Sequence, residues 1–291
     1  MAQMTPEWIA WIDDNIARGV PPQTLIDTLL QHQFTAAQAE QAVRVRLPGS
    51  GPPATDAGDD QALLRLAAMV EQYQPENTGP QPGNALRIGE HVIQVRLTLE
   101  RPRLIVFDNV LTADECTQLI ALSRSKLARS TTVDETTGRA EIHAHRTSSG
   151  TFFAINETPF IARLDARIAA LMQLPVENGE GLQILNYQVG GEYKPHYDYF
   201  PPEQPGSAAH IANGGQRVAT LIVYLNQVEE GGGTVFPELG LSVAPAPGSA
   251  VYFAYCNSKD QIDPLTYHGG NPVIRGEKWI ATKWMRQRAY R

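Results

Sequence analysis

The sequence is poor in cysteine and contains no long apolar run. Its 291 residues include two cysteines, Cys116 and Cys256, so a fold held together by several disulfides is excluded. One bond between the two is possible by count, but reduced thiols are the expected state. No stretch approaches the roughly 20 consecutive apolar residues that cross a bilayer, and no basic segment followed by an apolar one opens the chain. We therefore expect a cytoplasmic protein with no membrane partner.

Positive charge is also scarce. The chain has 24 lysine and arginine residues against 31 aspartate and glutamate residues, which gives a formal net charge of −7. A protein that binds the phosphate backbone of a nucleic acid usually carries a basic surface, so nucleic acid is not an expected partner. With 42% hydrophobic and 19% charged residues, the composition is typical of a soluble globular protein with one core and a small extra module.

The beginning of the chain has the pattern of three short helices. Apolar residues recur at helical spacing after Thr5, after Pro21-Pro22 and after Thr35. Three such helices make only a small bundle, for which a packing role or a protein partner is the expected function. The stretch LPGSGPPATDAGDD that follows combines proline, glycine, serine and aspartate, a composition typical of a linker.

Beyond residue 60 the pattern changes to short strands. A helix is expected at residues 62–73 and another after the capping box that runs from Thr112 to Glu115. Alternating or continuously apolar stretches bounded by glycine or proline predict strands, namely VIQVRLTLE, LIVFDNVL, QILNYQ, ATLIVYLN, TVFPEL, SAVYFAY and KWIATKWM. Residues 201–215 are expected to form a loop. The fold class is therefore mainly β with flanking helices (α+β), a sandwich, barrel or jelly roll.

Two histidines and an aspartate form the first candidate site. His196 and Asp198 lie two residues apart in NYQVGGEYKPHYDYF, so on a strand both side chains leave the same face. His268 follows 72 residues later, far enough to lie on another strand of the same sheet. Two histidines and one carboxylate can occupy one face of an octahedron around iron(II), leaving three positions open. Zinc would also accept these ligands, and a surface hydrogen bond or a turn histidine are the simpler alternatives.

Lys278, ten residues after His268, is the second candidate. In the strand KWIATKWM, alternation places Lys278 and Trp284 on one face and Trp279 and Lys283 on the other. An isolated ammonium inside a barrel would cost several kcal/mol and needs an anionic partner, which a ligand carboxylate would supply. Outside the barrel it would be an ordinary solvated lysine. The spacing from His268 favours the inside.

Together these motifs resemble the 2-oxoglutarate/iron(II)-dependent dioxygenases, in their prolyl 4-hydroxylase branch. The resemblance covers roughly residues 100–288 and includes HRTSSGTFF, ILNYQVGGEYKPHYDYF, GGQRVATLIVYLNQVEEGGGTVFP and the final H-x9-K-W. It implies a double-stranded β-helix, the jelly-roll core of that family. The expected organisation is a small helical module at 1–46, a Pro/Gly-rich linker at 47–60, a connecting helix and first strand at 61–99, and the dioxygenase domain at 100–291.

The resemblance also implies roles for individual residues. The iron ligands would be His196, Asp198 and His268. Lys278 would pair with the distal carboxylate of 2-oxoglutarate, while Tyr187 and Thr234 would hydrogen-bond the same cosubstrate. The positions that line the peptide groove in similar enzymes are Arg146, Ser148, Tyr193, Arg217 and Trp284. Trp284 lies roughly 20 Å along an extended strand from Lys278, which places it toward the barrel mouth.

The reaction implied is hydroxylation of a prolyl residue in a peptide or protein. The resemblance implies Fe(II) as cofactor, 2-oxoglutarate and O2 as cosubstrates, succinate and CO2 as products, and ascorbate as reductant. The first alternative is hydroxylation of a free amino acid or another small molecule. An alternative from another class is a non-catalytic β-barrel binding module whose N-terminal helices dock a partner.

Overall fold

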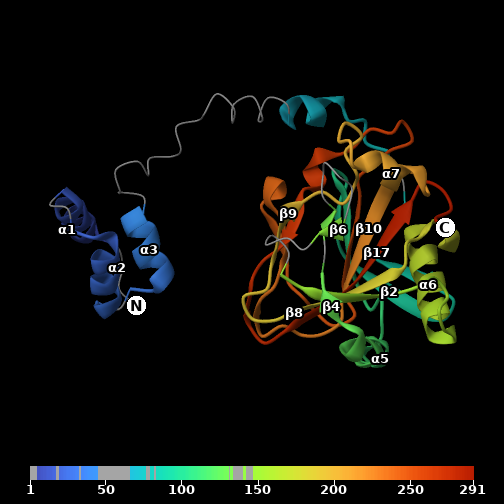
Figure 1. Ribbon diagram of the computed structural model, residues 1–291, viewed down its shortest axis with the longest axis horizontal. Coiled ribbons are helices and arrows are strands. Elements are labelled where there is room, and N and C mark those ends of the chain that lie inside the picture. The colour runs from blue at the N-terminus through green and yellow to red at the C-terminus, as the bar shows by residue number, and fades with distance from the viewer. Residues whose placement is uncertain are drawn as a thin grey trace. The chain divides into compact units, whose positions relative to one another are not determined.

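The computed structural model describes most of the chain, and its described residues fall into two compact units (Figure 1). The described residues are 5–17, 20–32, 34–44, 66–76, 79–81, 83–130, 132–133, 140–141 and 147–291. The units are Met1–Ala68 and Met69–Arg291. Within the described ranges, no helix has the length and apolar character that a bilayer span requires. The boundaries expected at residues 46, 60 and 99 stay predictions.

The first unit contains the three helices expected from the sequence. They are α1 (Pro6–Ala17), α2 (Pro22–Gln31) and α3 (Ala36–Arg44). α1 and α2 begin with proline, which at the first helical position lacks only an N–H that would have no partner there anyway. α3 begins after Thr35, whose hydroxyl accepts a hydrogen bond from the backbone N–H of Gln38. The helices bury a small core that includes Ile12, Leu25, Leu29, Phe34, Ala39, Ala42 and Val43.

The second unit is built on a nine-stranded antiparallel sheet. Its order is β1 (Ala85–Ile88), β2 (His91–Leu99), β3 (Arg103–Asp108), β14 (Ala250–Ala254), β10 (Arg217–Tyr224), β17 (Lys278–Arg286), β8 (Leu182–Tyr187), β7 (Ser149–Phe153) and β4 (Ala128–Arg129). Strands far apart in sequence are neighbours here, since β10 lies between β14 and β17. The strands predicted from the sequence fall in this sheet, except TVFPEL, whose first three residues form a strand of a smaller sheet.

A smaller sheet completes the barrel. Its four strands run in the order β13 (Leu241–Val243), β12 (Thr234–Phe236), β15 (His268–Gly270) and β9 (Tyr193–His196), again antiparallel. Two strand pairs stand apart, β11 (Glu230–Gly231) with β16 (Val273–Arg275) and β5 (Thr132–Val133) with β6 (Ala140–Glu141). The expected fold class, an α+β protein with a jelly-roll core, is confirmed.

Helices cover the outer face of the large sheet. α5 (Ala113–Ser123) begins at the expected capping box, and α6 (Pro159–Met172) packs its apolar face against the outer side of β17 (Figure 1). A second core lies inside the barrel, between the two sheets. The remaining helical pieces are residues 66–72, η1 (Arg124–Lys126), η2 (Val176–Asn178), α7 (Ser207–Ala212), η3 (Pro237–Leu239) and η4 (Pro264–Thr266).

The prediction of a loop at residues 201–215 is wrong in part, because Ser207–Ala212 form the helix α7. This helix has six residues and no side-chain hydrogen bond at its N-cap, so it lacks the local signals that would have indicated it. The two cysteines are free and buried.

Candidate metal centre and cosubstrate pocket

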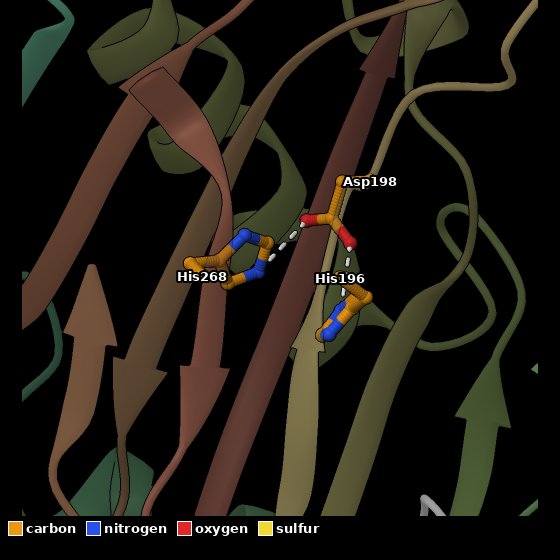
Figure 2. Close-up of side chains that lie close together, drawn as sticks. All are labelled: His196, Asp198 and His268. Carbon is orange, nitrogen blue, oxygen red and sulfur yellow. Dashed lines mark ion pairs between the residues drawn. The ribbon is translucent and has the colours of Figure 1, made fainter. Parts of the chain in front are cut away.

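The two candidate histidines and the aspartate meet at one point inside the barrel (Figure 2). β9 and β15 are paired so that His196 lies directly opposite His268. His196 Nε2 lies 3.5 Å from Asp198 Oδ1, and His268 Nε2 lies 3.6 Å from Asp198 Oδ2. One nitrogen or oxygen of each side chain falls within 4.8 Å of the others. Strand pairing thus brings together the residues that the sequence separates by 72 positions.

Backbone carbonyls orient both imidazole rings. His196 Nδ1 lies 3.0 Å from the carbonyl oxygen of Lys194, and His268 Nδ1 lies 3.0 Å from that of Thr266. A carbonyl only accepts, so each Nδ1 carries the proton and donates it. In the neutral ring the lone pair is then on Nε2, the nitrogen that faces Asp198, and this is the tautomer that a metal ligand requires.

Burial and charge prepare these groups to bind a cation. Burial lowers the pKa of His268 to about 4, and the nearby Asp198 carboxylate opposes this only in part. Burial would raise the pKa of Asp198, but His268 and His196 outweigh it and hold that pKa well below its usual range. At neutral pH the site therefore offers a neutral imidazole and an ionised carboxylate, the protonation states that metal ligands require. This donor set fits iron(II) bound on one face.

Lys278 lies inside the barrel, as its spacing from His268 indicated. Its side chain is 3% exposed and lies opposite Tyr187 on the neighbouring strand β8. Its Nζ lies 5.4 Å from the ring centre of Tyr187 and 5.9 Å from that of Tyr224. Burial lowers the pKa of Lys278 to about 8. Among the described residues no acidic side chain lies within ion-pair distance of it, so a buried cation faces the barrel interior.

Thr234 belongs to the same pocket. It is 3% exposed, and its Oγ1 accepts a 2.7 Å hydrogen bond from the hydroxyl of Tyr224. Thr234 lies opposite Gly270 on β15, two residues after His268. A Cβ on Gly270 would lie 3.6 Å from Lys278 Nζ, so the cation reaches the strand that carries His268. The three expected cosubstrate residues, Lys278, Tyr187 and Thr234, therefore lie together beside the metal centre.

Three of the five expected substrate-side residues lie close to the candidate ligands or to one another. The ring of Tyr193 stacks on His196 with centroids 3.7 Å apart. Arg217 lies over the ring of Trp284 at 4.1 Å and donates two hydrogen bonds to Glu180. The indole N–H of Trp284 is buried without a hydrogen-bond partner in the described part of the chain.

The other two substrate-side predictions have different outcomes. Ser148 is fully buried, and its hydroxyl donates a 2.9 Å hydrogen bond to Ser130. Arg146 lies outside the described residues. Whether any of the five contacts a substrate stays a prediction.

Two polar residues on β10 were not identified from the sequence. Tyr224 contacts Thr234 as described above, and Thr220 donates a 2.7 Å hydrogen bond to Asp198 Oδ2. The signal was present in ATLIVYLN, because alternation places Thr220 and Tyr224 on the same face of that strand. A threonine and a tyrosine on an otherwise apolar face indicate polar partners in the interior.

Comparison with known proteins gives consistent matches. The family model described as "2OG-Fe(II) oxygenase superfamily" matches residues 182–286. A probable prolyl 4-hydroxylase 10 of Arabidopsis thaliana is 44% identical over 261 residues, which cover 79% of this chain and 89% of that protein. Prolyl 4-hydroxylase 5 of the same plant is 41% identical over 227 residues, 72% of this chain and 74% of that protein.

A solved structure is also similar. The viral collagen prolyl hydroxylase of Paramecium bursaria Chlorella virus-1, in complex with 2OG, superposes with a TM-score of 0.50 and 28% identity. The superposition covers 63% of this chain and 95% of the viral one.

Proposed function

The chain belongs to the prolyl 4-hydroxylase branch of the 2OG-Fe(II) oxygenase superfamily, and we propose that it hydroxylates prolyl residues in a peptide or protein. The observation that carries this proposal is a buried lysine beside a His–Asp–His cluster, with no ion-pair partner in the described part of the chain. The cluster is suited to a divalent metal, and the lysine is suited to a dicarboxylate. Bound iron(II), with 2-oxoglutarate and O2, supplies the oxidising power that hydroxylates a C–H bond and releases succinate and CO2.

The residues of the chain supply positioning and a dry environment. His196, Asp198 and His268 would hold the metal from one side, and their carbonyl partners keep each Nε2 in place. Lys278 would bind the distal carboxylate of 2-oxoglutarate, because a buried ammonium gains most from a charged hydrogen bond in this setting. With Lys278 as the anchor, the keto-acid end of the cosubstrate would be left for the metal ligands His196, Asp198 and His268 to receive through the bound iron(II).

Neutral donors complete the cosubstrate pocket. The hydroxyl of Thr234 accepts from Tyr224, so its own proton is available for a carboxylate oxygen. The Tyr187 side chain, 4% exposed on β8, would donate to the same cosubstrate. Beside the candidate ligands, the ring of Tyr193 stacks on His196, and the indole N–H of Trp284 has no hydrogen-bond partner among the described residues. They would offer an apolar surface and a donor to a prolyl peptide.

The test is hydroxylation by the full chain. Succinate release from 2-oxoglutarate is measured with Fe(II) and ascorbate, with and without proline-rich peptides. Mass spectrometry of the peptides then detects a gain of one oxygen atom. Stimulation by peptide with that gain supports the proposal. Stimulation only by a free amino acid or another small molecule would replace the substrate class, and no turnover in any condition would favour the binding-module alternative.

Ligand variants provide the control. His196→Ala and Asp198→Ala should abolish iron-dependent turnover while the fold is kept, because each removes a metal ligand. Full activity in either variant would contradict the assignment of the metal centre.

A protein partner for the three N-terminal helices, and a cytoplasmic location, are part of the same proposal. The free, buried state of both cysteines is compatible with a reducing compartment.

A further inference from the structure

The two oxygens of Asp198 have different surroundings. Oδ2 accepts a 2.7 Å hydrogen bond from the Thr220 hydroxyl, which is fully buried on β10. Each oxygen also faces one imidazole, Oδ1 that of His196 at 3.5 Å and Oδ2 that of His268 at 3.6 Å, but no hydroxyl or amide of the described residues donates to Oδ1. The carboxylate is 6% exposed, so water has little access to either oxygen. Oδ2 therefore has one of its lone pairs occupied by the Thr220 proton, whereas Oδ1 accepts no such hydrogen bond.

The direction of the hydrogen bond follows from the available protons. An ionised carboxylate only accepts hydrogen bonds, so the single hydroxyl proton of Thr220 is donated to Asp198. The Tyr255 hydroxyl lies 3.1 Å from the same Thr220 oxygen and is also fully buried. Because the Thr220 proton is already used, Tyr255 donates to Thr220. The result is a directed chain from Tyr255 through Thr220 to Asp198.

The backbone of Asp198 is held from the same strand. Arg217 Nη1 donates to the carbonyl oxygen of Asp198 at 3.2 Å. Arg217 is itself fixed by two hydrogen bonds to Glu180, of 2.6 and 2.8 Å. Residues of β10 therefore hydrogen-bond both the main chain and the side chain of Asp198, which restrains rotation of the carboxylate about the Cβ–Cγ bond.

We propose that Thr220 is a positioning residue that reserves Oδ2 of Asp198 and leaves Oδ1 as the single oxygen that binds the metal. This inference rests on the proposed function, because it assumes a metal at the His–Asp–His cluster. A carboxylate that bound through both oxygens would occupy one coordination position more. Two histidines and a one-point carboxylate leave three positions, enough for a chelating 2-oxo acid and O2. The Thr220 hydroxyl thus protects the coordination position that the reaction uses.

Two substitutions at this position separate the hydroxyl from the packing. Thr220→Val keeps the shape and suits a strand but removes the proton, whereas Thr220→Ser keeps the hydroxyl and removes a methyl group. Each full-length variant is titrated with Co(II) alone, a probe that does not depend on turnover, and the visible absorption of bound Co(II) is recorded. We expect Thr220→Val to weaken Co(II) binding about 10- to 100-fold, the usual effect of losing a hydrogen bond to a metal ligand.

The pattern across variants distinguishes positioning from packing. Thr220→Val should also change the Co(II) spectrum, while Thr220→Ser restores both the affinity and the spectrum of the wild type. Tyr255→Phe keeps the bond from Thr220 to Asp198 and should have a smaller effect than Thr220→Val. Thermal unfolding shows that the variants are folded, and Thr220→Ala is the substitute if the valine variant is not.

Two results would overturn the inference. A folded Thr220→Val or Thr220→Ala chain with wild-type affinity and spectrum shows that the hydroxyl does not position Asp198. Equal losses in the valine and serine variants show that the hydroxyl alone does not position Asp198. Both results differ from a failure of the proposed function: a wild type that binds Co(II) through His196 but hydroxylates no prolyl peptide leaves the role of Thr220 intact. A wild type that binds no Co(II) overturns both.

Discussion

Two buried lysines, five residues apart on β17, have opposite environments. Lys283 is 1% exposed, and its Nζ lies 2.7 Å from Oδ1 of Asp165 on α6. Lys278 is 3% exposed, yet in the described parts of the chain its near neighbours are aromatic rings rather than carboxylates. An odd spacing on a strand places the two on opposite faces, one toward the helices and one into the barrel. The cation toward the helices is satisfied within the fold, whereas the cation inside the barrel is left for a ligand.

The largest expected effect comes from breaking the satisfied pair. Lys283→Met removes the cation and leaves Asp165 as an uncompensated buried charge, which typically costs about 3–5 kcal/mol of unfolding free energy. Urea unfolding measures the loss. The affinity for 2-oxoglutarate, measured on the folded variant, should not change. A variant as stable as the wild type would show that the pair does not hold α6 on the sheet.

The matching substitution inside the barrel should have the opposite profile. Lys278→Met removes a charged hydrogen bond to the cosubstrate, and a loss of about 3 kcal/mol corresponds to an affinity for 2-oxoglutarate more than 100-fold weaker. Since no acidic side chain of the described residues pairs with Lys278, the substitution leaves no known buried charge behind, and the free energy of unfolding should stay the same or rise. Titration with 2-oxoglutarate and urea unfolding provide the two measurements. Unchanged cosubstrate affinity would remove Lys278 from its role.

The surroundings of Lys278 were easier to predict from the sequence than those of Lys283. Alternation along KWIATKWM placed a lysine on each face, and the spacing from His268 indicated which one lies inside. The partner of Lys283 was missed because residues 154–180 were not assigned. Signals for α6 were present: Thr158 caps the helix, Pro159 follows, and apolar residues recur at helical spacing from Phe160 to Met172.

The site was predictable to a similar, limited depth. His196 and Asp198 lie two residues apart and were expected on one strand face, but β9 ends at His196 and Asp198 lies in the segment that follows it. His268 could be joined to them by the family pattern. The contact of Thr220 with Asp198 depends on how β10 lies relative to the segment after β9, which no local pattern contains. Alternation along β10 reveals that Thr220 points inward, but only the fold reveals what it meets.

Because Lys278 must be protonated to bind a carboxylate, the affinity for 2-oxoglutarate should depend on pH. Its pKa in the free protein is about 8, lowered by burial. Below pH 8 the ammonium is already present, and above it binding of the dicarboxylate must take up a proton. The apparent dissociation constant of 2-oxoglutarate should therefore rise about tenfold per pH unit above 8, until the pKa of the bound state is reached. Titrations from pH 7 to 9.5 test this. Lys278→Met is the control, whose weak binding should not follow this slope.

The smallest effect is expected when both charges of the satisfied pair are removed together. Lys283→Met combined with Asp165→Leu leaves no buried charge, and replacing such a pair by apolar residues is often neutral or stabilising. Asp165 Oδ2 also accepts a hydrogen bond from the backbone N–H of Asn156, but Asn156 is exposed, so water can replace that acceptor. Urea unfolding should place the double variant within about 1 kcal/mol of the wild type.

The single variants Lys283→Met and Asp165→Leu, with the double variant and the wild type, form a double-mutant cycle. The coupling energy between the two side chains should be several kcal/mol. A double variant as unstable as Lys283→Met alone would contradict the comparison. It would mean that Lys283 stabilises the fold by packing its carbon chain beside Gly179 rather than by neutralising Asp165. The difference between the two lysines would then lie in how their carbon chains pack and not in whether their charge has a partner.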